Sequence, residues 1–161
     1  LRADEIECRV AQAKGTGVSL LLYKDARCDQ NILDETVGAF NWQRQHCREN
    51  ANCIVSIWDE KKQQWISKED TGTESNTEKE KGLASDSFKR ACFNWGIGRE
   101  LYTAPFIWIK PEDCTALKQN GDRWQCYDSF FVEKIAIENK RIMGIAIKNA
   151  KTGKRCFVWQ R

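Results

Sequence analysis

The sequence contains no apolar run that approaches the roughly 18 to 20 residues of a membrane-spanning helix. It also shows no basic and then apolar leader followed by a small-residue cleavage site. Internal repeats and low-complexity tracts are absent, which excludes repeat architectures. We therefore expect a soluble protein of the cytoplasm.

The chain also lacks a nucleotide-binding fingerprint of the form Gly-x4-Gly-Lys-Ser/Thr. Gly15-Thr-Gly-Val and Thr152-Gly-Lys have neither the spacing nor the strand-to-helix context. Histidine occurs once, at His46, which we expect on a strand facing a neighbouring element. ATP-driven work and histidine-based acid–base catalysis are therefore not expected, and neither is a cofactor.

No Cys-x-x-Cys pair occurs among the 8 cysteines, and the shortest interval runs from Cys47 to Cys53. Their density is below that of disulfide-stapled scaffolds, and a chain of 161 residues needs no staples. We expect reduced, mostly buried thiols and no bound metal. One combination leaves zinc open, namely His46-Cys47 together with Cys53.

With 161 residues, 41% apolar content and 7 Trp, the chain can bury one proper core, so we expect a single domain. The formal charge of +3 is unevenly distributed, because residues 132–161 hold eight Lys or Arg against Glu133 and Glu138. This asymmetry indicates either a polyanionic partner or a basic sheet edge that guards against aggregation.

The most informative segment is 70–96, which predicts a polar loop followed by an amphipathic helix. Thr77 and Glu80 have the spacing of a capping box, so the helix should begin at Glu78, and Gly96 should end it. The predicted buried stripe consists of Leu83, Ala84, Phe88, Ala91, Cys92 and Trp95.

Lys89, Arg90 and Phe93 fall on the opposite, outward side of this helix. Cations together with an aromatic ring suit single-stranded nucleic acid, because phosphates are neutralised while unpaired bases stack. The alternative is that both cations are simply solvated and that Phe93 packs under another element or subunit.

Elsewhere, periodicity predicts helices at 4–13 and 25–38 with a buried strand at 18–23 between them. Three short strands are expected at 40–46, 53–58 and 64–68, forming an antiparallel meander.

After the long helix we expect an apolar segment at 106–109 and a flexible connection at 111–122. Three more strands should follow at 130–137, 141–147 and 155–159. The predicted fold class is therefore α+β, an antiparallel β-meander packed against a long amphipathic helix, with additional C-terminal β-hairpins.

Several motifs in this order resemble the single-strand annealing proteins of homologous recombination. They are Asp70-x-Gly72, then Ala84-Ser85-Asp86-x-x-Lys89-Arg90-Ala91, then Gly96-Ile-Gly-Arg-x-Leu-Tyr102. The resemblance is to the Rad-fifty-two superfamily and more closely to its phage relatives of the Sak type. It covers about residues 1–110 of one domain spanning 1–161, with 111–123 as a connection and 124–161 as basic hairpins resembling the phage branch.

The resemblance implies a homo-oligomeric ring or helical filament that holds single-stranded DNA in a basic groove and anneals complementary strands without ATP. It also implies a role in recombination and repair in a bacterial host's cytoplasm, with a single-strand-binding protein or an exonuclease as further partner. The groove residues that it implies are Lys89, Arg90, Arg27, Lys24, Lys81, Thr73 and Ser75.

The chain departs from this family at Phe93, where eukaryotic members carry another basic residue. If Phe93 faces the groove, stacking replaces a charge contact, and if it faces a neighbouring subunit, it is an interface residue.

Two other functions stay open. Asp34 with Glu60-Lys-Lys62 resembles the residues with which some nucleases hold Mg²⁺. Phe157 and Trp159, alternating with Arg155 and Arg161, suggest an RNA-binding or single-stranded-DNA-binding module without annealing activity.

Overall fold

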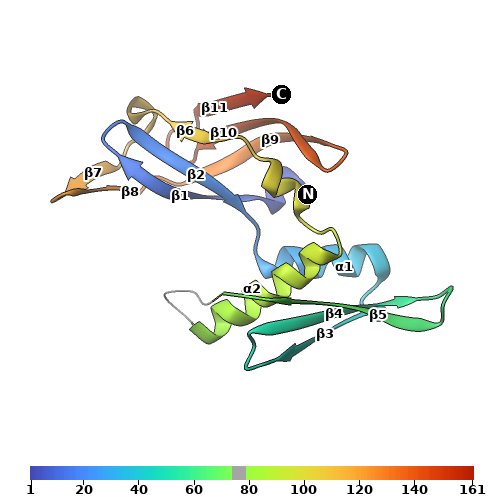
Figure 1. Ribbon diagram of the computed structural model, residues 1–161. Coiled ribbons are helices and arrows are strands. Elements are labelled where there is room, and N and C mark those ends of the chain that lie inside the picture. Colours follow the sequence, from blue (N-terminus) through green and yellow to red (C-terminus); the bar gives the residue numbers. More distant parts are fainter. Residues whose placement is uncertain (74–78) are drawn as a thin grey trace. The chain divides into compact units, whose positions relative to one another are not determined.

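The computed structural model describes residues 1–73 and 79–161, which form two compact units (Figure 1). Unit 1 contains Leu1–Lys24 and Arg99–Arg161, and unit 2 contains Asp25–Gly98. Because unit 1 is built from both ends of the chain, it spans the boundaries at 110 and 124 that the sequence suggested.

The predicted fold class is wrong. The chain is mostly β, with about half of its described residues in strands and about a quarter in helices. The two α-helices of the described part, α1 (Ala26–Val37) and α2 (Lys79–Asn94), have only 12 and 16 residues. The dominant element is a nearly closed sheet in unit 1 rather than a meander against a long helix, because the N-terminal segment adds strands to those of the C-terminal region.

The sheet of unit 1 has six antiparallel strands in the order β11-β10-β9-β1-β2-β6. Its strands are β1 (Glu7–Lys14), β2 (Gly17–Tyr23), β6 (Ile107–Ile109), β9 (Phe130–Glu138), β10 (Arg141–Asn149) and β11 (Arg155–Gln160). The predicted strands at 18–23, 130–137, 141–147 and 155–159 are thus confirmed to within two residues at each end.

The helix predicted at 4–13 is wrong, since only Ala3–Glu5 form a short 3-10 turn and β1 follows. The pairing of β1 with β2 shifts register between Val10 and Gln12. This bulge brings Val10 and Ala13, three residues apart, against the same core. A bulged strand therefore reproduced the spacing of a helix face.

The connection predicted at 111–122 is wrong in part. It holds a 3-10 turn at Pro111–Asp113 and the strand β7 (Leu117–Asn120), which pairs with β8 (Arg123–Cys126). Gly121 lies in the turn between them with a φ of +61°, a conformation that glycine adopts at little cost.

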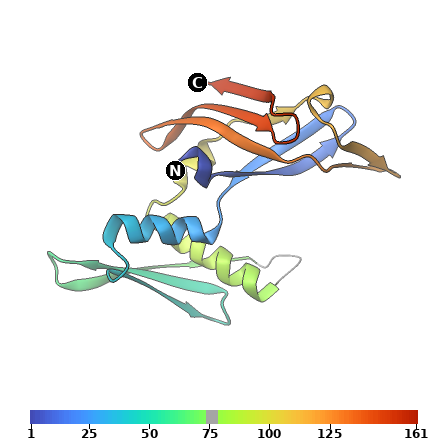
Figure 2. The same cartoon turned by 180° about the vertical axis from the view of Figure 1, so that it is seen from behind.

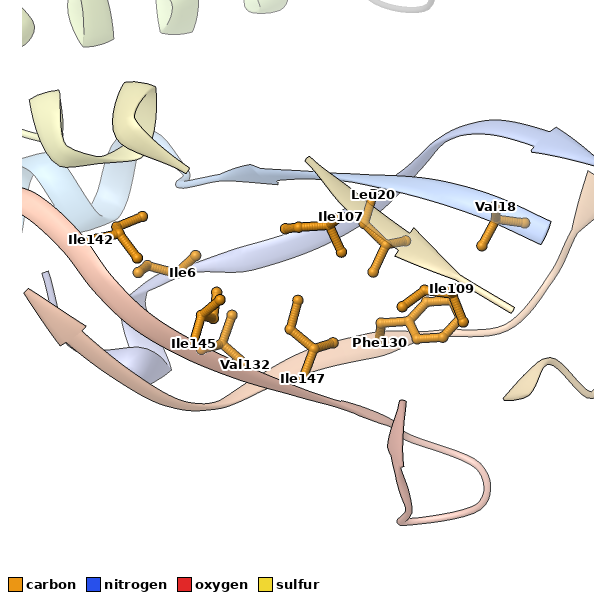
Figure 3. Close-up of a cluster of buried hydrophobic side chains, with 10 residues drawn as sticks. All are labelled: Ile6, Val18, Leu20, Ile107, Ile109, Phe130, Val132, Ile142, Ile145 and Ile147. Carbon is orange, nitrogen blue, oxygen red and sulfur yellow. The ribbon is translucent and has the colours of Figure 1, made fainter. Parts of the chain in front are cut away.

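The core of unit 1 lies on the inner side of its curved sheet. Figure 3 shows aliphatic side chains from β2 and β6 facing those from β9 and β10. Val18, Ile109 and Ile147 are fully buried there. Because successive side chains of a strand alternate between its faces, one face of each strand supplies this core.

Unit 2 contains the three-stranded antiparallel sheet β3-β4-β5, formed by Trp42–Cys47, Asn52–Asp59 and Gln64–Thr71. These strands confirm the three that the sequence predicted. Asp25 caps α1 by accepting a hydrogen bond from Cys28 N–H at 3.0 Å, and Gly38 ends that helix, also as expected. Figure 2 shows α2 lying along one face of this sheet.

Candidate nucleic-acid interface

One side of α2 is held firmly against the sheet of unit 2. Phe88, Ala91 and Cys92 of the predicted stripe are fully buried and pack with Cys53 and Val55 of β4. Ala91 and Cys92 follow Phe88 by three and four residues, so all three side chains lie on one face of the helix. Their burial fixes the orientation of the helix about its own axis. Of the residues on the other side, Arg90 is exposed, and Lys89 and Phe93 are half-buried.

The C-terminal end of α2 has the geometry of a Schellman motif. Gly96 has a φ of +96°, its N–H donates to Phe93 O at 2.9 Å, and Ile97 N–H donates to Cys92 O at 3.2 Å. The predicted end of the helix at Gly96 is thus confirmed. The predicted start at Thr77, Glu78 and Glu80 cannot be compared, because Thr77 and Glu78 lie outside the described residues and the side chain of Glu80 is not described.

Arg90 lies on the outward side of α2 and is oriented by an acidic neighbour one turn earlier. Its Nε is 3.0 Å from Asp86 Oδ2, and its side chain is 46% exposed. Asp86 also accepts hydrogen bonds from Thr73 N–H at 2.7 Å and Thr73 Oγ1 at 3.3 Å. The cation is thus held at the junction of the loop and the helix.

Burial opposes ionisation of Asp86, but the hydrogen bonds from Thr73 and Arg90 outweigh it, so the pKa of Asp86 is lowered. The carboxylate is therefore charged at neutral pH and offsets part of the positive charge of Arg90.

Lys89 is half-buried on the outer side of α2, and no residue in the described ranges forms an ion pair or hydrogen bond with its ammonium group. Phe93, also half-buried, follows it at i+4, the spacing at which helix side chains are neighbours. An ammonium group and a phenyl ring thus lie one turn apart on this face.

The Asp70-x-Gly72 part of the motif supports the helix rather than facing outward. Asn94 of α2 donates to Asp70 Oδ2 at 3.2 Å, and Gly72 N–H donates to Ala51 O at 2.8 Å. A Cβ added at Gly72 would lie only 2.6 Å from the backbone N of Ser87. Glycine is therefore needed for the chain to pass this close to α2.

The other predicted groove residues are spread over both units. In unit 2, Arg27 in the first turn of α1 has an 86% exposed side chain, with Nε 3.7 Å from Asp25, and Lys81 is exposed on α2. Ser75 lies outside the described residues. Lys24 belongs to unit 1 and is buried, with 7% exposure.

Two further cations of unit 2 were missed by the sequence analysis. Arg44 of β3 places its guanidinium 4.1 Å from the ring centroid of Phe88, underneath α2. Lys68 of β5 donates to Asn94 O at 3.3 Å and lies 4.7 Å from the ring of Trp95, at the C-terminal end of α2. Strand alternation places Arg44 and Lys68 on the face of the sheet that α2 covers. The sequence pattern does not predict that a helix covers this face.

The predicted position of His46 on a strand next to another element is confirmed. Its Nδ1 is 3.4 Å from Ser87 Oγ on α2, and the Arg44 guanidinium lies 2.8 and 3.2 Å from its Nε2. Burial and the charge of Arg44 lower the pKa of His46. Cys53 is its cross-strand partner, whereas Cys47 follows His46 and so points to the other face. The residues for which zinc was left open are therefore not assembled.

The residues of the two alternative functions have structural partners. Asp34 accepts a hydrogen bond from Trp42 Nε1 at 2.7 Å, and Glu60 accepts one from Trp58 Nε1 at 2.8 Å. In unit 1, Phe157 and Trp159 of β11 pack against the core.

The one charged side chain of β11, Arg155, also has a structural partner. The Arg155 guanidinium donates to the two carboxylate oxygens of Glu133 at 2.6 and 3.1 Å.

Comparison with protein-family models, with curated proteins and with solved structures finds no match to this chain. In the described part of the chain, no helix combines the length and apolar character that crossing a membrane would take.

Proposed function

We propose that this protein binds single-stranded DNA along the outer face of α2 and anneals complementary strands without nucleotide hydrolysis. The observation that carries the proposal is the adjacent pair Lys89 and Arg90 on the side of α2 opposite its buried stripe, with Phe93 one turn beyond Lys89. The sequence motifs that resemble annealing proteins include this pair.

The chemistry of annealing needs little more than such a surface. Base pairing supplies the free energy, so the protein has to neutralise phosphates, remove hairpins and keep bases accessible. Lys89 and Arg90 would contact phosphates, and Phe93 would offer a flat apolar partner to a base, worth about 1 to 3 kcal/mol. Arg27, Lys81 and Thr73 would extend the same track.

A homo-oligomeric ring or filament is part of the proposal, because a few phosphate contacts in one chain bind weakly and many in a row add up. In the described part of unit 2, the outer strands β3 and β5 each pair on one side only. Such edges can pair with another chain. We place this activity in the cytoplasm of a bacterial host, in recombination and repair.

The test is the double variant Lys89→Ala/Arg90→Ala compared with Lys61→Ala/Lys62→Ala. The control removes the same charge from the exposed turn between β4 and β5. We expect the first variant to lose annealing of complementary oligonucleotides while it assembles as the wild type does in size-exclusion chromatography. The control should anneal normally.

Salt dependence gives a second measure of the same contacts. Each lost contact to single-stranded DNA should reduce the slope of log affinity against log salt by about 0.7, so the double variant should lose about 1.4 per bound chain. Annealing by the Lys89/Arg90 variant at the wild-type rate, or an equal loss in the control, would contradict the site.

A further inference from the structure

Unit 1 contains a group of sulfur and oxygen ligands that the proposed function does not use. The Sγ atoms of Cys114 and Cys126 and a carboxylate oxygen of Asp128 lie within 4.8 Å of one another. Cys114 precedes β7, Cys126 ends β8, and Asp128 lies between β8 and β9. A hairpin and the segment after it thus bring together residues up to 14 positions apart.

Asp128 is held in a fixed orientation by its neighbours. Its Oδ2 accepts hydrogen bonds from Thr115 N–H and Ala116 N–H, both at 2.9 Å. Its Oδ1 accepts from the Thr115 hydroxyl and from Asn149 Nδ2. This is the kind of support that orients a metal ligand.

We propose that Cys114, Cys126 and Asp128 bind a thiophilic divalent cation, with Zn²⁺ as the best fit. The thiol of Cys126 donates to Asp128 Oδ2 at an S···O distance of 3.3 Å. A tetrahedral zinc with bonds of about 2.3 Å to sulfur and about 2.0 Å to oxygen holds those two atoms about 3.5 Å apart. A cation in place of the shared proton would therefore change the separation of these two atoms by about 0.2 Å, and the Sγ of Cys114 lies within 4.8 Å of both.

Binding exchanges protons for metal in a balanced way. Cys114 and Cys126 each lose a proton to solvent and form a bond from sulfur to the cation, while Asp128 Oδ2 exchanges its hydrogen bond from the Cys126 thiol for a bond to the cation. Two thiolates and one carboxylate give a net charge of −1 with the divalent cation. The fourth position is left to water, because the ligand group among the described residues contains these three side chains only.

All of the ligands lie in unit 1, whereas Lys89 and Arg90 lie in unit 2, so the metal site and the proposed DNA interface are tested with different variants. The experiment uses the whole reduced chain, loaded with Zn²⁺ and desalted, with metal content measured by mass spectrometry. We expect one zinc per chain, lost in Cys114→Ser and in Cys126→Ser. The control Cys47→Ser, a half-buried cysteine of unit 2, should keep it.

Two measurements on the wild type do not depend on the folding of any variant. Co²⁺ in place of Zn²⁺ should give the thiolate charge-transfer band and the visible bands of a tetrahedral site. Zinc should also protect Cys114 and Cys126, but not Cys47, from alkylation. The proposal is overturned by a reduced chain that retains no zinc, by zinc that survives both variants, or by a cobalt spectrum without thiolate bands.

Discussion

Replacing Gly72 with alanine should destabilise unit 2, although the change adds a single methyl group. The new Cβ would lie 2.6 Å from Ser87 N, 3.0 Å from Ser87 Cα and 3.1 Å from Leu83 O. Ordinary contacts are about 3.5 Å or more, so the strand end and the helix would have to separate by roughly 0.9 Å. All three atoms belong to the backbone of α2, so no side chain can rotate away.

The expected change in the free energy of unfolding follows from two opposing effects. Inserting a methyl group into a packed site costs about 1 to 3 kcal/mol. Replacing glycine where φ is not positive, as at Gly72, favours folding by about 0.4 to 1 kcal/mol through the unfolded chain. The strain is the larger effect, so we expect a net loss of about 1 to 2 kcal/mol.

Urea unfolding followed by tryptophan fluorescence measures this loss. With a urea slope of about 2 kcal/mol per molar, the midpoint should fall by roughly 0.5 to 1 M. Gly144→Ala is the matched control, because its Cβ would lie 3.5 Å from Trp159 O and 3.9 Å from Ala136 Cβ, which are ordinary contacts. A Gly72→Ala midpoint equal to or above that of the wild type would refute the close approach of the strand and α2.

Two more changes test unit 2 and unit 1 separately. The folded pKa of His46 is lowered, so unfolding takes up a proton below about pH 6.5, and stability should fall as the pH drops toward 5. The unfolding midpoints at pH 7.5 and 5.5 should differ less in His46→Gln than in the wild type. An unchanged difference would show that His46 is not the group that makes stability depend on pH. In unit 1, Asn139 and Lys140 have φ values of 50° and 60° in the turn between β9 and β10. Lys140→Gly should raise stability by about 0.5 to 1 kcal/mol, and a lower thermal midpoint would count against it.

The sequence predicted most of the local elements because their signals are local. The cap at Asp25 and the buried stripe of α2 depend on residues within a few positions of one another, and these features are present. The helix predicted for the N-terminal segment was wrong for the opposite reason. The bulge between Val10 and Gln12 depends on the partner strand β2, so its spacing could not be told from that of a helix.

The predicted fold class was wrong because it depends on pairing between strands that are far apart in the sequence. The six-stranded sheet joins strands from the two ends of the chain, and β1 meets β9 through the pair Glu7 and Phe131. Such pairing leaves no local pattern. The ligand group at Cys114, Cys126 and Asp128 was missed for the same reason, because cysteine spacing along the chain says little about proximity across strands.

The motif that resembles annealing proteins combines residues with two different physical roles. Gly72 fits against the backbone of α2, Asp70 accepts from Asn94, and Asp86 holds Thr73 and Arg90. These residues would be required for the local structure in any protein built this way, whatever it binds. Lys89 has no such structural partner among the residues of 1–73 and 79–161, so the structure alone gives no reason for a lysine there.

The proposed DNA interface therefore depends on Lys89 more than on the other residues of the motif. A separate Lys89→Ala variant should leave unfolding by urea unchanged, because the half-buried Lys89 has no ion-pair or hydrogen-bond partner among the described residues and such a surface substitution changes the free energy of unfolding by no more than about 0.5 kcal/mol. The same variant should weaken binding to single-stranded DNA and reduce its salt slope by about 0.7 per bound chain. Loss of stability without loss of binding would assign Lys89 to the structure of α2, and the proposed interface would then lack the cation on which it depends.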